Sequence, residues 1–149
     1  MTATGHAVIG AVIAAKIGNP ALAIPVAIAS HVAADAFPHW DIGTNRKSKS
    51  HKLFFIESIA DLVLSFIAAF LVIQFLNPAT SLFYGFIIVI AAQSFDWIAA
   101  PYIFLHWDFT PFFQLAKVQK YFDNRLNKPW GVVGQVGILL LLTVIAKFT

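Results

Sequence analysis

The sequence predicts an all-α integral membrane protein, a helical bundle of about five hydrophobic helices with one interfacial amphipathic helix. Hydrophobic residues make up 59% of the 149 residues and charged residues only 11%, which leaves too little polar surface for a soluble domain of this size. Residues 62–95 contain no charged side chain, and about 20 apolar residues suffice to cross a bilayer. We therefore expect a single membrane domain over residues 1–149.

Turns and polar loops separate the hydrophobic segments. Residues 5–18 and 21–37 are short and are joined by a Gly-Asn-Pro turn, so we expect them to form a tight hairpin that spans the membrane or re-enters it. Small residues such as Gly10 and Ala11 would let another helix approach the first of them closely. Three longer hydrophobic helices are predicted at 53–76, 82–105 and 130–147.

Residues 111–126 have an amphipathic pattern, with apolar side chains such as Phe112 and Phe122 on one face and Lys117, Lys120 and Arg125 on the other. A basic amphipathic helix between two spans is expected to lie in the interface plane, close to anionic lipid.

Basic residues also predict the orientation in the membrane. Eight of the ten Lys and Arg residues lie within two segments, 46–52 and 117–128, and the positive-inside rule assigns both segments to the cytoplasm. The N-terminus is then cytoplasmic and the C-terminus lies outside, in a protein integral to the cell (inner) membrane.

Four side chains of metal-ligand type occur within the eleven residues HVAADAFPHWD, at 31–41: His31, Asp35, His39 and Asp41. His31 and Asp35 are four residues apart, so both project from one face of a helix. Such a pair is typical of helices that present ligands to a shared metal in a helical bundle.

Four more polar residues fall in the same cytoplasmic half under this topology: His6, Glu57, Asp61 and Asp96. Glu57 and Asp61 repeat the i, i+4 spacing early in the third helix. A carboxylate at mid-membrane costs roughly 2.5 to 3.5 kcal/mol on insertion scales, so a cluster of them requires shared protons or a bound cation.

The chain has no cysteine, so a metal would be held by nitrogen and oxygen. Imidazole beside carboxylate favours a divalent transition metal, zinc before manganese or iron, as one ion or as two ions about 3.5 to 4 Å apart, the arrangement used for phosphate ester hydrolysis. The predicted metal ligands are His6, His31, Asp35, His39, Asp41, Asp61 and Asp96. Glu57 is the predicted catalytic general base, although it could equally bridge two metals.

These observations predict a membrane-embedded metal-dependent hydrolase of a phosphoester or phospholipid-type substrate at the cytoplasmic leaflet. Arg46, Lys47 and Lys49 would hold the substrate phosphate. The expected partners are membrane lipids and a lipidic or phosphorylated small molecule, and no nucleic acid is predicted.

Two alternatives remain open from the sequence. Intramembrane carboxylates and histidines also mark metal-ion or proton transporters and channels, although the outer half of this chain carries only Lys16 and Lys147 as charged residues, which favours the enzyme. The second alternative is a non-catalytic membrane protein stabilised by a fully ligated metal.

The segments GHAVIGAVIAA and SHVAADAFPHWD, followed by the acidic pair of the next span, resemble the YdjM-like family of small inner-membrane proteins, described as predicted membrane-bound metal-dependent hydrolases. The resemblance implies metal binding through His6, His31, Asp35, His39 and Asp41, and hydrolysis of an unspecified bond.

Overall fold

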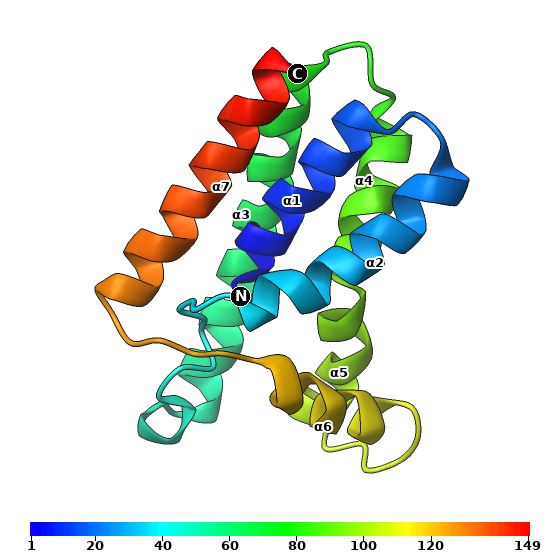
Figure 1. The fold of residues 1–149 in the computed structure, drawn as a ribbon. Coiled ribbons are helices and arrows are strands. Elements are labelled where there is room, and N and C mark those ends of the chain that lie inside the picture. The colour runs from blue at the N-terminus through cyan, green and yellow to red at the C-terminus, as the bar shows by residue number, and fades with distance from the viewer.

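The computed structural model describes residues 1–149 as seven α-helices without a β-strand, which confirms the all-α prediction (Figure 1). The helices are α1 (Ala3–Lys16), α2 (Pro20–Ala36), α3 (His51–Leu76), α4 (Leu82–Ala92), α5 (Ser94–Leu105), α6 (Phe112–Phe122) and α7 (Trp130–Phe148), and a short 3₁₀ turn, η1, covers Arg46–Ser48. The predicted hairpin corresponds to α1 and α2, and the predicted amphipathic helix to the shorter α6.

The prediction of about five hydrophobic helices is confirmed only as an all-helical fold, because the structure is not a bundle of five spans. Only α3 and α7, with 26 and 19 residues, are each long and apolar enough to cross a membrane. The α4–α5 pair meets the same requirement only as one unit, which is bent by 59° at its break. Since α1 and α2 have 14 and 17 residues, both are shorter than the roughly 20 residues that a span needs. By length and composition, two helices could therefore cross a membrane, or three spans are possible if the bent pair counts as one.

The continuous helix predicted at 82–105 is broken at Gln93, a residue that also makes hydrogen bonds across the bundle. The Gln93 side chain is buried, and its amide nitrogen donates to the Ala3 carbonyl (3.0 Å) and the Ser65 hydroxyl (3.0 Å). A buried amide must be satisfied in this way. The break turns α5 away from the axis of α4 and brings Asp96, in the first turn of α5, toward the ends of α1 and α2.

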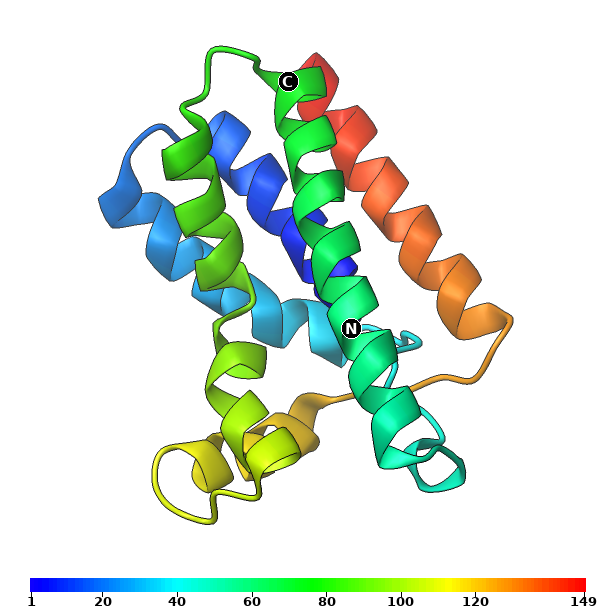
Figure 2. The same ribbon diagram turned by 180° about the vertical axis from the view of Figure 1, so that it is seen from behind.

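Helix α1 lies in the middle of the bundle, against α2, α3, α4 and α7 (Figures 1 and 2). Ala7 and Ala11 are completely buried. At Gly10, an added Cβ would lie 3.0 Å from the Ala92 Cβ and 3.0 Å from the Val89 Cα. The small residues of α1 therefore permit the close approach to α4 that the sequence suggested.

Replacing Gly10 by valine is expected to destabilise the protein by about 1 to 3 kcal/mol, because the side chain would overpack the α1–α4 contact. Thermal unfolding in detergent, followed by tryptophan fluorescence, measures the effect. Gly137→Val is the matched control, since Gly137 is also helical and no atom lies within 4 Å of its added Cβ. Equal losses in the two variants would contradict this account of the contact.

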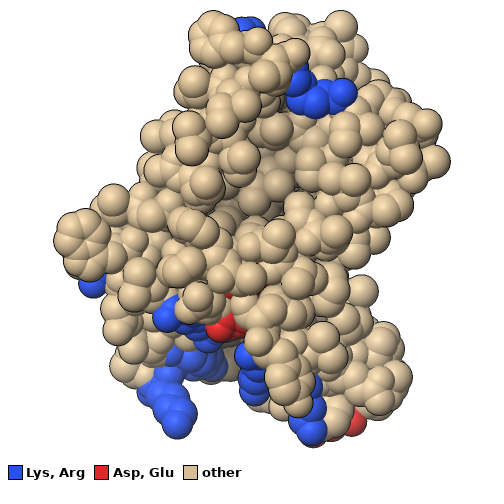
Figure 3. Space-filling model, viewed as in Figure 1, with Lys and Arg blue, Asp and Glu red and all other residues tan.

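The outer faces of the long helices are apolar. Leu64 and Leu71 of α3 are 57% and 59% exposed, and Leu140 of α7 is 61% exposed. Most Lys and Arg side chains gather at the lower end of the molecule, and the middle of the same face carries none (Figure 3). An uncharged apolar girdle beside a charged end is the surface of a membrane-associated protein.

Candidate metal centre

The hairpin of α1 and α2 brings two predicted ligands into direct contact. The rings of His6 and His31 stack with their centroids 3.8 Å apart and their planes 8° from parallel. His6 Nε2 lies 3.2 Å from Asp35 Oδ1, and His31 Nε2 lies 3.3 Å from Asp35 Oδ2. All three side chains are buried, and the Met1 amino group also contacts Asp35.

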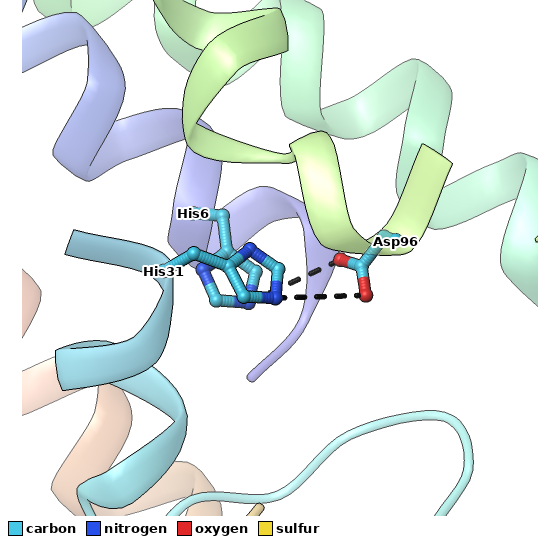
Figure 4. A group of neighbouring side chains, drawn as sticks. All are labelled: His6, His31 and Asp96. Atoms are coloured by element: carbon cyan, nitrogen blue, oxygen red, sulfur yellow. Dashed lines mark ion pairs between the residues drawn. The ribbon is translucent and has the colours of Figure 1, made fainter. Parts of the chain in front are cut away.

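Asp96 of α5 faces the two imidazoles from the other side (Figure 4). Its carboxylate oxygens lie 4.0 Å from His6 Nε2 and 3.9 Å from His31 Nε2. One ligand atom from each of His6, His31 and Asp96 lies within 4.8 Å of the other two, and together they form the first group of residues that could hold a metal ion.

The hydrogen bonding of His31 suits a metal ligand. Its Nδ1 lies 2.8 Å from the Ala92 carbonyl oxygen, which can only accept, so Nδ1 carries a proton and Nε2 is the ring atom available to a metal. Hydrogen bonding of the distal nitrogen to a carbonyl is typical of metal-bound histidines. Both ring nitrogens of buried His6 have no hydrogen-bond partner, and a cation beside Nε2 would satisfy one of them.

A second group of candidate ligands consists of His39, Asp41 and Asp123, with ligand atoms again within 4.8 Å of one another. His39 Nε2 lies 3.3 Å from Asp123 Oδ1. Asp123 directly follows α6, and backbone hydrogen bonds tie this segment to the end of α2: Asn124 N donates to the Asp35 carbonyl (2.9 Å), and His39 N donates to the Asn124 carbonyl (3.1 Å).

Asp123 is held as a carboxylate. Burial alone would raise the pKa of Asp123, but the contact with His39 and the nearby Arg125 guanidinium outweigh burial and keep the pKa below its ordinary value. Arg125 Nε lies 2.8 Å from Asp123 Oδ2 and 3.1 Å from Asp41 Oδ2. The guanidinium thus orients both acids of the second group.

Both groups fit a divalent metal on the chemistry of their donors. Each combines buried imidazole nitrogen with carboxylate oxygen, which is the donor set of zinc and related transition metals in proteins without cysteine. Of the seven predicted ligands, the structure brings His6, His31 and Asp96 together in the first group, with Asp35 in contact. It brings His39 and Asp41 together in the second.

Asp61 stands outside both groups. Its carboxylate accepts from the backbone nitrogens of Ala3 (2.7 Å) and Thr4 (3.2 Å) and from the Thr4 hydroxyl (2.6 Å). These are unpaired donors at the N-terminus of α1, and an acid there also complements the helix dipole. The geometry therefore gives Asp61 a capping role in place of the predicted ligand role.

The predicted general base Glu57 is also separate from the cluster. Its carboxylate pairs with Lys49 Nζ at 2.6 Å, and Lys49 also donates to the Ile42 carbonyl (2.9 Å). Glu57 and Lys49 line a smaller surface pocket that includes none of the candidate metal ligands. The i, i+4 pair of α3 therefore does not form the second half of the site that its spacing suggested.

A cavity of about 720 Å³ borders both groups and is lined by Asp35, Asp41, Asp96 and Asp123. Of the three basic residues predicted to hold phosphate, only Arg46 lines it, and Lys47 and Lys49 do not. Lys120 and Arg125, which the sequence assigned to the interfacial helix, are the other basic residues of the lining.

Sequence reasoning missed Asp123 and Gln119 as site residues. Gln119 of α6 donates to Asp96 Oδ1 (2.7 Å), and its Nε2 lies 3.2 Å from His31 Nε2. Both residues lie in segment 111–126, which the sequence pattern assigned to an interfacial amphipathic helix. The available signal was Asp123 itself, an acid at the end of an otherwise basic helical segment.

No family model, no curated protein and no solved structure matches this chain. The resemblance to the YdjM-like family therefore stays a prediction, and the functional argument depends on the geometry of the site.

Proposed function

We propose that this protein is a membrane-embedded, metal-dependent hydrolase that cleaves a phosphoester in an amphiphilic, phospholipid-type substrate. The observation that carries the proposal is the buried cluster of His6, His31 and Asp35, with Asp96, beside a large cavity that is both acidic and apolar. A cluster of titratable side chains beside a large pocket is the usual starting point for assigning an active site.

The lining of the cavity supports an amphiphilic substrate. Phe55 and Ile59 of α3 and Trp97 and Phe104 of α5 form apolar walls, and basic side chains, including Arg46, lie in the same lining. A substrate with its phosphate near the carboxylates and basic residues would place its apolar chain between α3 and α5. Both helices also expose apolar side chains on the outside of the molecule, where lipid would supply the substrate.

Different residues of the site would bind the metal and the substrate phosphate. A divalent ion held there, for which zinc is favoured over manganese or iron, would supply Lewis acidity toward a phosphoryl oxygen and would lower the pKa of a bound water. His6, His31 and Asp96 would hold that ion, with Asp35 in contact with both histidines. Asp96, whose side chain is 40% exposed, reaches the cavity and is fixed by Gln119. Arg46 and Arg125 would bind the phosphate oxygens.

The charge distribution supports a cytoplasmic site. Most basic residues gather at the end of the molecule that also shows acidic side chains (Figure 3), and the positive-inside rule assigns that end to the cytoplasm. We propose that the N-terminus and the metal centre face the cytoplasm and that the C-terminus faces outward across the inner membrane. Reporter fusions at the C-terminus would test this orientation.

Metal removal is expected to abolish phosphoester hydrolysis by the purified protein, and added Zn²⁺ or Mn²⁺ is expected to restore it. Elemental analysis measures the metal content, and a panel of phosphodiesters, phosphomonoesters and phospholipids measures the hydrolytic activity. His31→Ala should lower turnover by more than about 100-fold, since it removes a ligand and not only a supporting contact. His51→Ala is the control, because His51 lies outside both metal groups.

A protein that contains no stoichiometric metal would contradict the proposal. A protein that binds metal, hydrolyses no member of the panel and instead carries metal ions or protons into liposomes would be the transporter of the first alternative. Bound metal with neither activity would support the non-catalytic, metal-stabilised alternative.

A further inference from the structure

The second group of candidate ligands, around His39 and Asp123, takes no part in the proposed hydrolysis. We propose that it is a second metal subsite and that Asp35 bridges it to the first, so that the protein binds two divalent ions per chain. This inference deepens the proposed function and rests on it.

The contact between His39 and Asp123 needs a positive charge, from a second ring proton or from a bound cation. His39 Nδ1 lies 2.8 Å from the Phe37 carbonyl oxygen, so Nδ1 carries a proton, and Nε2 offers a lone pair whenever the ring is neutral. That nitrogen faces Asp123 Oδ1 at 3.3 Å, another lone-pair atom. Neither atom has a hydrogen-bond partner, and the His39 side chain is completely buried. A cation between the two atoms removes the unfavourable arrangement.

Asp35 contacts the histidines of both groups. Its Oδ1 lies 3.2 Å from His6 Nε2 and 3.9 Å from His39 Nε2, and its Oδ2 lies 3.3 Å from His31 Nε2. Helical bundles hold pairs of metal ions with carboxylates and histidines that project inward from facing helices, and Asp35 lies between two such sets of imidazoles.

Of the two acids in the second group, only Asp123 has an oxygen without a hydrogen-bond partner. Arg125 pairs with Oδ2 of Asp123, which leaves Oδ1 facing His39. In Asp41, Oδ1 accepts from the Thr44 hydroxyl (2.8 Å) and Oδ2 pairs with Arg125, so both oxygens already have partners. Asp123 is therefore the stronger ligand and Asp41 the weaker. Both line the cavity that Asp35 and Asp96 also line, so two ions would face one substrate.

The inference predicts the stoichiometry and the magnetic coupling of bound Mn²⁺. Metal-free protein in detergent, titrated with Mn²⁺, is expected to bind two ions per chain. Electron paramagnetic resonance should then show less of the isolated six-line signal than the bound manganese would give, because a carboxylate bridge couples the two ions. Asp123→Asn is expected to bind one ion, with the full six-line signal.

Matched variants separate a ligand role from a structural role. Asp108→Asn neutralises an acid outside both groups and should keep two ions. If Asp123→Asn fails to fold, His39→Gln tests the same subsite and should likewise bind one ion.

Each other result overturns a defined part of the inference. One ion in the wild-type protein, unchanged in Asp123→Asn, would mean that His39 and Asp123 form only an imidazolium–carboxylate ion pair. Two ions with full six-line intensity would remove the Asp35 bridge. No bound Mn²⁺, Zn²⁺ or Fe²⁺ would overturn the proposed function itself, a result distinct from the loss of the second subsite alone.

Discussion

Asp35→Asn is expected to eliminate the stabilisation of the protein by divalent metal. Asp35 is buried and contacts His6, His31 and His39, so its carboxylate serves both candidate subsites. A ligand that binds only the folded state stabilises it by about 2.7 kcal/mol at 100 times its Kd. We expect the wild-type protein to show a rise in Tm of this origin with Zn²⁺ or Mn²⁺, and Asp35→Asn to show none.

The comparison must be made between metal-loaded and metal-free samples of each variant. Asp35 also contacts the Met1 amino group, so its replacement changes the stability of the metal-free protein as well. The metal-dependent difference in Tm isolates the ligand role. Asp108→Asn should retain the full difference, and an equal rise in Tm for Asp35→Asn and wild type would contradict the assignment of Asp35.

Gly131→Ala is expected to destabilise the protein by about 3 kcal/mol, the upper end of the usual range for overpacking. Gly131 lies in the first turn of α7, where the backbone meets two other segments. An added Cβ would collide with the Leu126 carbonyl and lie 2.9 Å from the Trp40 nitrogen. Since Trp40 N donates to the Gly131 carbonyl (3.2 Å), a shift of this segment would break that bond too.

The same substitution should weaken the second metal subsite. The segment from Asp123 to Gly131 lies along the end of α2 through backbone bonds, including Leu126 N to the His39 carbonyl (2.6 Å). Displacing it would move Asp123 away from His39. Gly137→Ala is the control within α7, because its added Cβ meets no atom within 4 Å. Thermal unfolding and Mn²⁺ stoichiometry measure the two effects, and a Gly131→Ala protein as stable as Gly137→Ala would refute the close contact.

The candidate metal centre was predictable in part because burying its histidines and carboxylates in an apolar environment costs free energy. Buried histidines and carboxylates in a chain with so few charges require compensation, and the spacing of His31 and Asp35 fixes both on one helical face. Asp61 has the same spacing with Glu57, yet it caps α1. Sequence spacing indicates which face of its own helix a side chain occupies. It does not indicate which other helix that face packs against.

The hydrophobic composition and the periodicity of the sequence by themselves determined an all-helical, membrane-associated protein and the positions of most helices. They also singled out His6, the 31–41 segment and Asp96 as candidate metal ligands. Only the tertiary structure decided the lengths of the candidate spans, the break at Gln93 and the position of Asp123 beside His39. Apolar content depends on the residues alone, whereas these two regions form hydrogen bonds with segments about 90 residues away in the chain, such as Gln93 to Ala3 and Asn124 to Asp35. Such pairings arise from packing and leave no periodic signal in the sequence.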